Sequence, residues 1–132
     1  MGLDMYAYRT KVQLSKPVDF EVELNEAREA TGESPIQDLA YWRKHPNLHG
    51  WMEELYRRKG GEAEVFNCAP VELTMEDLFI LEADIKYGKL PKTSGFFFGE
   101  SDGSEQEEDL EFVRRARQAI EEGDRVFYDS WW

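Results

Sequence analysis

The chain has 132 residues, of which 41% are apolar, and its formal net charge is −12. This length predicts a single domain, residues 1–132, with enough apolar side chains for a core. The acidic balance argues against direct nucleic-acid binding and against an anionic membrane as a partner, because both repel a strongly acidic surface.

The chain has a single cysteine, Cys68. A lone cysteine excludes an intramolecular disulfide and a multi-thiolate metal site, and it is typical of a reducing cytoplasm. The first residues lack the basic region and apolar run of a secretory signal, and no apolar run approaches the length of a membrane span. We therefore expect a cytoplasmic protein.

Two stretches near the start alternate in the way that strands do. In residues 2–13, one face carries small and aliphatic side chains, and the other carries Asp4, Tyr6 and Tyr8. Both faces of this strand are expected to be partly covered. Residues 18–24 alternate apolar side chains with acids, and they predict a half-exposed strand.

Helical patterns follow. Residues 25–30 predict a short helix, residues 33–38 a loop, and residues 40–44 a lead into the next helix. That helix is predicted from Pro46 to Lys59, since proline suits a first helical turn. Five apolar residues recur at helical spacing over this range: Leu48, Trp51, Met52, Leu55 and Tyr56.

Residues 63–73 predict one extended segment with a kink at Pro70, and Cys68 in it is expected to be buried and structural. Thr74 is the predicted N-cap of a helix that stops at Gly88, because Asp77 follows three residues later.

A polar, cationic turn begins at Lys89 and leads to three consecutive phenylalanines, 96–98. These predict a buried strand, because three exposed Phe residues would favour aggregation. Ser104 is then the predicted cap of a helix that continues to Gly123, and residues 125–132 predict a last strand held in the sheet.

Together these elements predict an α+β fold, in which a mainly antiparallel sheet of about four to five strands carries three helices on one face. The pairing of the Phe strand with the last strand stays open, because the intervening helix permits a parallel crossover.

The strongest candidate site combines aromatic rings with cations. Rings can stack on a base, while Lys, Arg and loop amides hold phosphate, so we expect these residues to converge on an anionic, ring-containing ligand. The alternative is that Tyr and Trp are core residues and that Arg43 and Lys44 pair with acids. The candidate ligand-binding residues are Asp4, Tyr6, Tyr8, Tyr41, Trp42, Arg43, Lys44, Lys92, Thr93, Ser94 and Gly95.

Other side chains that could act in catalysis or bind a metal form no catalytic constellation or metal site in the sequence. His45 and His49 are four residues apart, but a third ligand is missing, so capping or surface roles are expected. Cys68 would need a histidine base to act as a nucleophile. The acids at 102–108 do not match a calcium loop and predict a solvated helix start. We expect no cofactor and no enzymatic activity.

Three blocks of the sequence resemble a family of small phage-borne proteins: MGLDMY at residues 1–6, YWRK at 41–44, and LPxxSGFFFG at 90–99. Proteins of this family are sometimes labelled phosphoglycerate kinase. That label does not fit, because 132 residues cannot build two lobes and the chain has no G-x-x-x-x-G-K-[ST] loop. The resemblance implies a phage or prophage setting, and hence the cytoplasm of a host cell.

Two functions follow as hypotheses. The first is a phage-type protein that sequesters a small anionic, nucleotide-like ligand and thereby inhibits host defence signalling. The alternative is an acidic protein that mimics nucleic acid or binds a host protein, because residues 100–111 contain seven acids. A small hydrolase is a third, weaker option. A homo-oligomer with a shared pocket also stays open.

Overall fold

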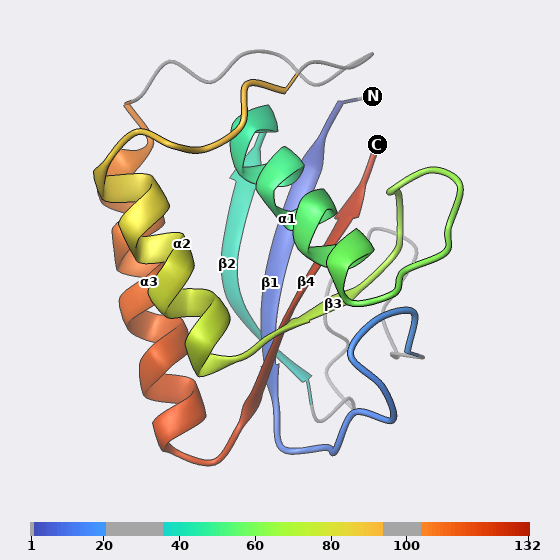
Figure 1. The fold of residues 1–132 in the computed structure, drawn as a ribbon. Coiled ribbons are helices and arrows are strands. Elements are labelled where there is room, and N and C mark those ends of the chain that lie inside the picture. Colours follow the sequence, from blue (N-terminus) through green and yellow to red (C-terminus); the bar gives the residue numbers. More distant parts are fainter. Residues whose placement is uncertain (1, 21–35, 94–103) are drawn as a thin grey trace.

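The computed structural model describes residues 2–20, 36–93 and 104–132. Four strands form one sheet in the order β2-β1-β4-β3, and every neighbouring pair is antiparallel (Figure 1). The strands are β1 (Asp4–Thr10), β2 (Ile36–Arg43), β3 (Val71–Leu73) and β4 (Arg125–Trp131). The predicted antiparallel α+β architecture is therefore confirmed, and the last strand lies inside the sheet between β1 and β3.

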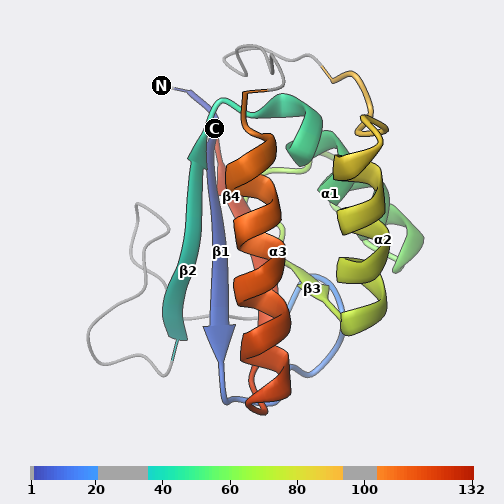
Figure 2. The same cartoon turned by 90° about the vertical axis from the view of Figure 1, so that its left-hand side faces the viewer.

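Three helices cover one face of this sheet, as Figure 2 shows from the side. They are α1 (Pro46–Arg58), α2 (Met75–Lys86) and α3 (Gln106–Glu121). The apolar stripe predicted for the first helix is buried in the main core between the helices and the sheet. That core also takes Met5 and Ala7 from β1 and Leu3 from just before it.

The opposite, outer face of the sheet carries a second apolar cluster. Tyr6 and Tyr8 of β1 pack there with Phe127 of β4 and Phe20. Because side chains alternate along a strand, β1 supplies both clusters, which is why both of its faces are buried as expected. All of these side chains are at most 9% exposed.

The predicted cap of α2 is confirmed and that of α3 is wrong. Thr74 and Asp77 form a reciprocal capping box, in which each side chain bonds the backbone N–H of the other residue. Helix α3 instead has Glu105 at its N-cap position, with no side-chain cap, although three acids in its first turn complement the helix dipole.

The loop predicted at 33–38 and the helix lead-in predicted at 40–44 are wrong over residues 36–43, because these residues form β2. The alternating pattern is hidden by a register shift: Ala40 faces Ala7 and Asp38 faces Tyr8, so Leu39 has no opposite residue on β1. This extra residue interrupts the period of two from which a strand is normally recognised. The strand ends before Lys44, whose φ of 57° is incompatible with continued extension.

The expected extended segment at 63–73 is also wrong except at its end, where Val71–Leu73 form β3. Cys68 has a left-handed φ of 55° and is exposed, so it is neither in a strand nor buried. Its backbone N–H donates to the carbonyl of Ser130. The side chain of Asn67 bonds both the N–H and the carbonyl of Trp132, which fixes this connection beside the end of β4.

Of the strand predicted at 18–24, the described part contributes one bridge, from Val18 to Val71. The rest of that strand, the short helix at 25–30 and the Phe strand at 96–98 lie outside the described residues.

Candidate functional site

Part of the predicted aromatic and cationic set assembles on the outer face of β1 and β2. The register places Tyr6 opposite Tyr41 and Asp4 opposite Arg43. The Tyr41 hydroxyl donates to Asp4 Oδ1 at 2.7 Å, Arg43 Nη1 lies 3.3 Å from the same oxygen, and the Tyr6 and Tyr41 ring centroids are 5.3 Å apart. Asp4 therefore already engages the Arg43 guanidinium.

The ring of Tyr41 is the most accessible part of this group, with 54% of the residue exposed. Partial burial and its hydrogen bond to Asp4 raise the pKa of the Tyr41 hydroxyl above its usual value. Tyr41 therefore stays protonated at neutral pH and acts as a donor.

Two other predicted site residues belong to the core. Tyr8 is fully buried against Phe127, at a centroid distance of 5.1 Å. Trp42 points to the helix side, where its ring packs edge-on against Phe112 and its Nε1–H donates to Asp109 at 3.0 Å. The interpretation of these two rings as core residues is therefore the one that fits the structure.

Lys92 and Thr93 lie apart from Arg43 and Lys44. The N–H of Thr93 donates to Asn47 Oδ1 in the first turn of α1, so residues 92–93 lie at the end of the molecule where β2 passes into α1. No ion pair or hydrogen bond between described residues joins Arg43 or Lys44 to Lys92 or Thr93. Ser94 and Gly95 lie outside the described residues.

A groove of about 660 Å³ runs along the outward side of α1 and contains Lys92. Such a volume is in the range of small-molecule sites. Arg57 is held by the carbonyl of Ala63 and by Glu53 at 3.5 Å. The groove is lined by Gly50, Glu53, Glu54, Arg57 and Arg58 of α1, and by Pro91, Lys92 and Thr93.

Arg58 and Lys92 are the available cations of this groove. Both are exposed, and neither forms an ion pair with another residue in the described ranges. The segment that carries Lys92 packs closely on the helix, since a Cβ atom placed on Gly50 would lie 1.9 Å from Thr93 Oγ1. Glycine at position 50 thus allows the loop to approach α1.

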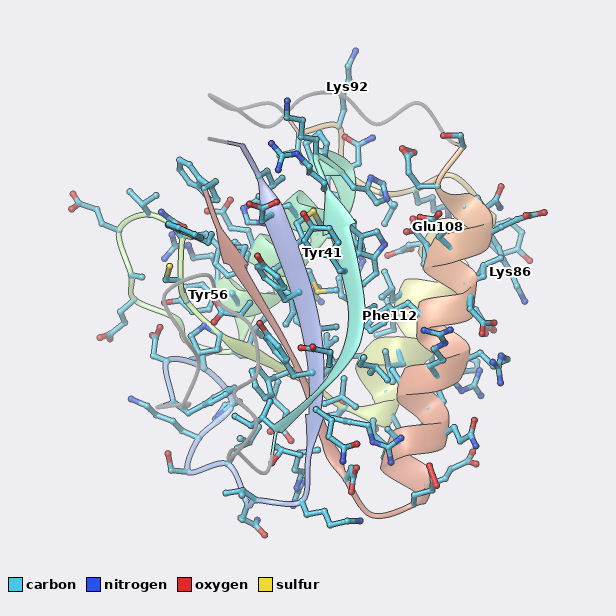
Figure 3. The ribbon with its side chains drawn as sticks, turned by 180° about the vertical axis from the view of Figure 1, so that it is seen from behind. Tyr41, Tyr56, Lys86, Lys92, Glu108 and Phe112 are labelled. Carbon is cyan, nitrogen blue, oxygen red and sulfur yellow. The ribbon has the colours of Figure 1, made fainter. Side chains whose placement is uncertain are left out.

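A second groove, of about 380 Å³, lies between β2 and α3 (Figure 3). Here Glu111 is engaged by Arg114 and Arg115, and its hydrogen bonds from Arg114 lower its pKa to about 2. The lining residues are Ala40, Tyr41 and Trp42 of β2, and Glu107, Glu108, Glu111, Phe112 and Arg115 of α3.

Both histidines are buried, which corrects the expected capping or surface roles. His45 Nε2 lies 2.7 Å from Asp109 Oδ2, so this carboxylate serves both the imidazole and the Trp42 indole. His49 Nδ1 lies 2.6 Å from the Tyr128 hydroxyl. Because the two imidazoles face different partners, they do not form a shared metal site. No group of three or more metal-ligating side chains occurs in the described part of the chain.

Asp109 is a functional-site residue that the sequence did not single out. It follows directly after the acids at 102–108, for which a solvated helix start is predicted, yet it is 2% exposed. Its helical position gives a signal, since Asp109 lies four residues before Val113 and three before Phe112, on the buried stripe of α3. Its partners Trp42 and His45 are distant in sequence, so no local pattern indicates that they contact Asp109.

Neither a scan against protein-family models nor searches of curated proteins and of solved structures found a match to this chain. Among the helices in the described ranges, none has the length and apolar character needed to cross a membrane. The two grooves and the residues that line them are therefore the candidate functional sites.

Proposed function

We propose that the protein binds a small anionic, nucleotide-like ligand in the groove between α1 and residues 91–93, and that it does so without turnover. The observation that carries this proposal is the pair of exposed cations, Arg58 and Lys92, on a groove of about 660 Å³. On a chain of net charge −12, two cations without an ion-pair partner in the described ranges are a local attraction for an anion.

The positions of the predicted ligand-binding residues limit which of them can contact one ligand. Lys92 and Thr93 belong to this groove, whereas Tyr41 and Trp42 line the other one. The phosphate of the ligand is therefore the part that the α1 groove recognises, through Lys92 and the planar guanidinium of Arg58. Acids at Glu53 and Glu54 limit how much negative charge fits there, which favours one phosphate group over an extended polyanion.

The biological consequence follows from the resemblance to phage-borne proteins. A phage protein that holds a phosphorylated signal of the host lowers its free concentration, and binding alone is enough to blunt a defence that depends on this signal. Such a role needs no catalytic group.

Isothermal titration with pyrophosphate, mononucleotides and cyclic dinucleotides tests the proposal. At least one probe should bind, and Lys92→Ala or Arg58→Ala should each weaken binding about tenfold, the effect of losing one charge-assisted contact. Lys16→Ala is the matched control, because Lys16 is an exposed cation away from the groove.

Equal losses in the Lys92 and Lys16 variants would indicate general charge attraction and would contradict the groove. So would the absence of binding by every probe. Chromatography of the ligand after prolonged incubation checks the second part of the proposal, since recovery of a cleaved product would show turnover.

A further inference from the structure

Within the described residues, β2 has one free edge. In the described sheet, β2 is the outermost strand and pairs on one side only, with β1. The side chains of Gln37, Asp38, Tyr41 and Arg43 along this strand are exposed. An open edge strand presents unpaired backbone groups to which another strand can be added.

The register identifies which backbone groups face outward. The N–H of Lys44 donates to the carbonyl of Leu3 at 2.9 Å, so Leu3 and Lys44 are a hydrogen-bonded pair of the antiparallel ladder. These pairs alternate with non-hydrogen-bonded pairs. Consequently, Trp42 and Ala40 direct their backbone groups to β1, whereas Tyr41 and Arg43 direct theirs to the free edge.

The other half of β2 is less available. Leu39 lies at the register shift, and its carbonyl accepts a hydrogen bond from Arg115 Nη1 at 3.4 Å. A bulge of this kind interrupts regular pairing along an edge. The part of the edge that can receive a strand is therefore Ala40–Arg43. Its first three residues, 40–42, also line the groove between β2 and α3.

The charge of that groove selects the partner. Glu107 and Glu108 are exposed, and neither forms an ion pair with another described residue. Figure 3 shows Glu108 and Phe112 on the side of α3 that faces β2. A basic side chain on an added strand would meet these carboxylates, while an apolar one would contact Tyr41, whose ring is 54% exposed.

We propose that an extended basic segment of a partner protein binds as a fifth strand along Ala40–Arg43, with its cations opposite Glu107 and Glu108. This inference is independent of the anion groove on α1. A second copy of the chain is disfavoured as the occupant, because its net charge of −12 would be brought against the same acids.

The experiment uses the full chain and a short peptide in which lysine alternates with valine. Amide hydrogen exchange followed by NMR is the main measurement. Tyr41 and Arg43 amides should exchange rapidly in the free protein and should become protected when the peptide is present. Ala40 and Trp42 amides should be protected in both states, because they already bond β1.

Two matched comparisons separate the backbone from the charges. Glu107→Gln/Glu108→Gln should weaken peptide binding about tenfold or more and reduce its salt dependence, whereas Glu62→Gln/Glu64→Gln, with two exposed acids elsewhere, should not. Tyr41→Pro removes the ring together with an outward-facing N–H, and it should bind more weakly than Tyr41→Ala, which loses the ring but keeps the N–H donor.

Three results would overturn the proposal. The first is that the lysine–valine peptide does not bind. The second is that it binds but leaves Tyr41 and Arg43 amides unprotected, which would mean side-chain attraction without strand addition. The third is that the same amides become protected as the protein alone is concentrated, which would make a second copy the occupant. Because the wild-type chain gives all three readouts, the test does not depend on a variant that folds.

Discussion

The Nδ1 atom of His49 lies 2.6 Å from the hydroxyl oxygen of Tyr128, and both side chains are buried between α1 and β4. The imidazole ring also bonds the backbone of Phe66. Burial lowers the pKa of His49 from 6.5 to about 4, and it raises the pKa of Tyr128 well above its usual value. Both groups are therefore neutral in the folded protein at pH 7.

This pair predicts a loss of stability in mild acid. Between pH 6.5 and 4, His49 takes up a proton in the unfolded chain but not in the folded one, so the free energy of unfolding falls as pH falls. At about 1.4 kcal/mol per pKa unit, the loss amounts to about 3 kcal/mol, and it is absent above pH 7. Urea unfolding at several pH values measures it.

His49→Gln is the control, because the carboxylates titrate in both proteins and their contribution cancels. The stability difference between wild type and variant should shrink by about 3 kcal/mol from pH 7 to pH 4. Parallel pH profiles for the two proteins would contradict the assignment of the acid sensitivity to His49.

Asp109 predicts a large effect of a single substitution. Asp109→Ala leaves the Trp42 indole N–H and the His45 imidazole without their buried acceptor, and an unsatisfied buried group costs about 1–3 kcal/mol. We therefore expect the free energy of unfolding to fall by about 2–4 kcal/mol. Glu108→Ala, at the exposed neighbouring position, should change it by no more than about 0.5 kcal/mol. Similar losses in both variants would show that the loss of negative charge in the first turn of α3, not the loss of the buried acceptor, controls the effect.

A substitution at Gly50 tests whether the close approach of residues 91–93 to α1 needs a glycine at this position. In Gly50→Ala, the new methyl group would lie 1.9 Å from Thr93 Oγ1 and 2.9 Å from Thr93 Cβ, so residues 91–93 must move away from the helix. We expect a cost of about 1–3 kcal/mol in unfolding free energy, as for other overpacked sites. Thr93→Gly in the same chain removes both atoms and should restore much of the loss. Chemical shifts of Asn47, which bonds the Thr93 N–H, report whether the loop has moved.

Thr74 predicts a smaller and more local effect. Thr74→Ala removes the side-chain oxygen that accepts the Asp77 N–H, and the loss of such a cap costs about 1 kcal/mol. Thr74→Ser keeps this oxygen and should stay close to wild type. Thermal unfolding of the three proteins compares them, and a Ser variant as unstable as the Ala variant would show that the hydroxyl is not the stabilising group.

The sequence was most informative where a pattern is local. Proline at 46 followed by an apolar stripe predicts α1 to within one residue at its C-terminal end, and the Thr74–Asp77 pair predicts the cap of α2. The missed strand β2 shows the opposite case. Its period is broken at Leu39 by the bulge, and its last residues join directly to a helix, so local periodicity favours a helical lead-in.

The site was harder to predict than the fold because it depends on contacts between distant residues. Whether Trp42 points to a ligand or to the core is decided by Asp109 and Phe112, which belong to another element. The pairing of Arg43 with Asp4 depends on strand register, which a bulge changes. The sequence does show rings and cations of the right kinds, but not that Tyr41 and Lys92 line different grooves.

The position of β4 between β1 and β3 has a consequence for how the chain folds. The centre of the sheet is made by β1 near residue 4 and β4 near residue 131, so its closure joins segments from opposite ends of the described chain. Pairings of such long sequence separation slow folding, because a large loop must close before they are formed. Until β4 is in place, β1 and β3 each have an unpaired edge rich in apolar side chains. Refolding yield should therefore fall with rising protein concentration, since these transient edges can pair between molecules before the sheet is complete.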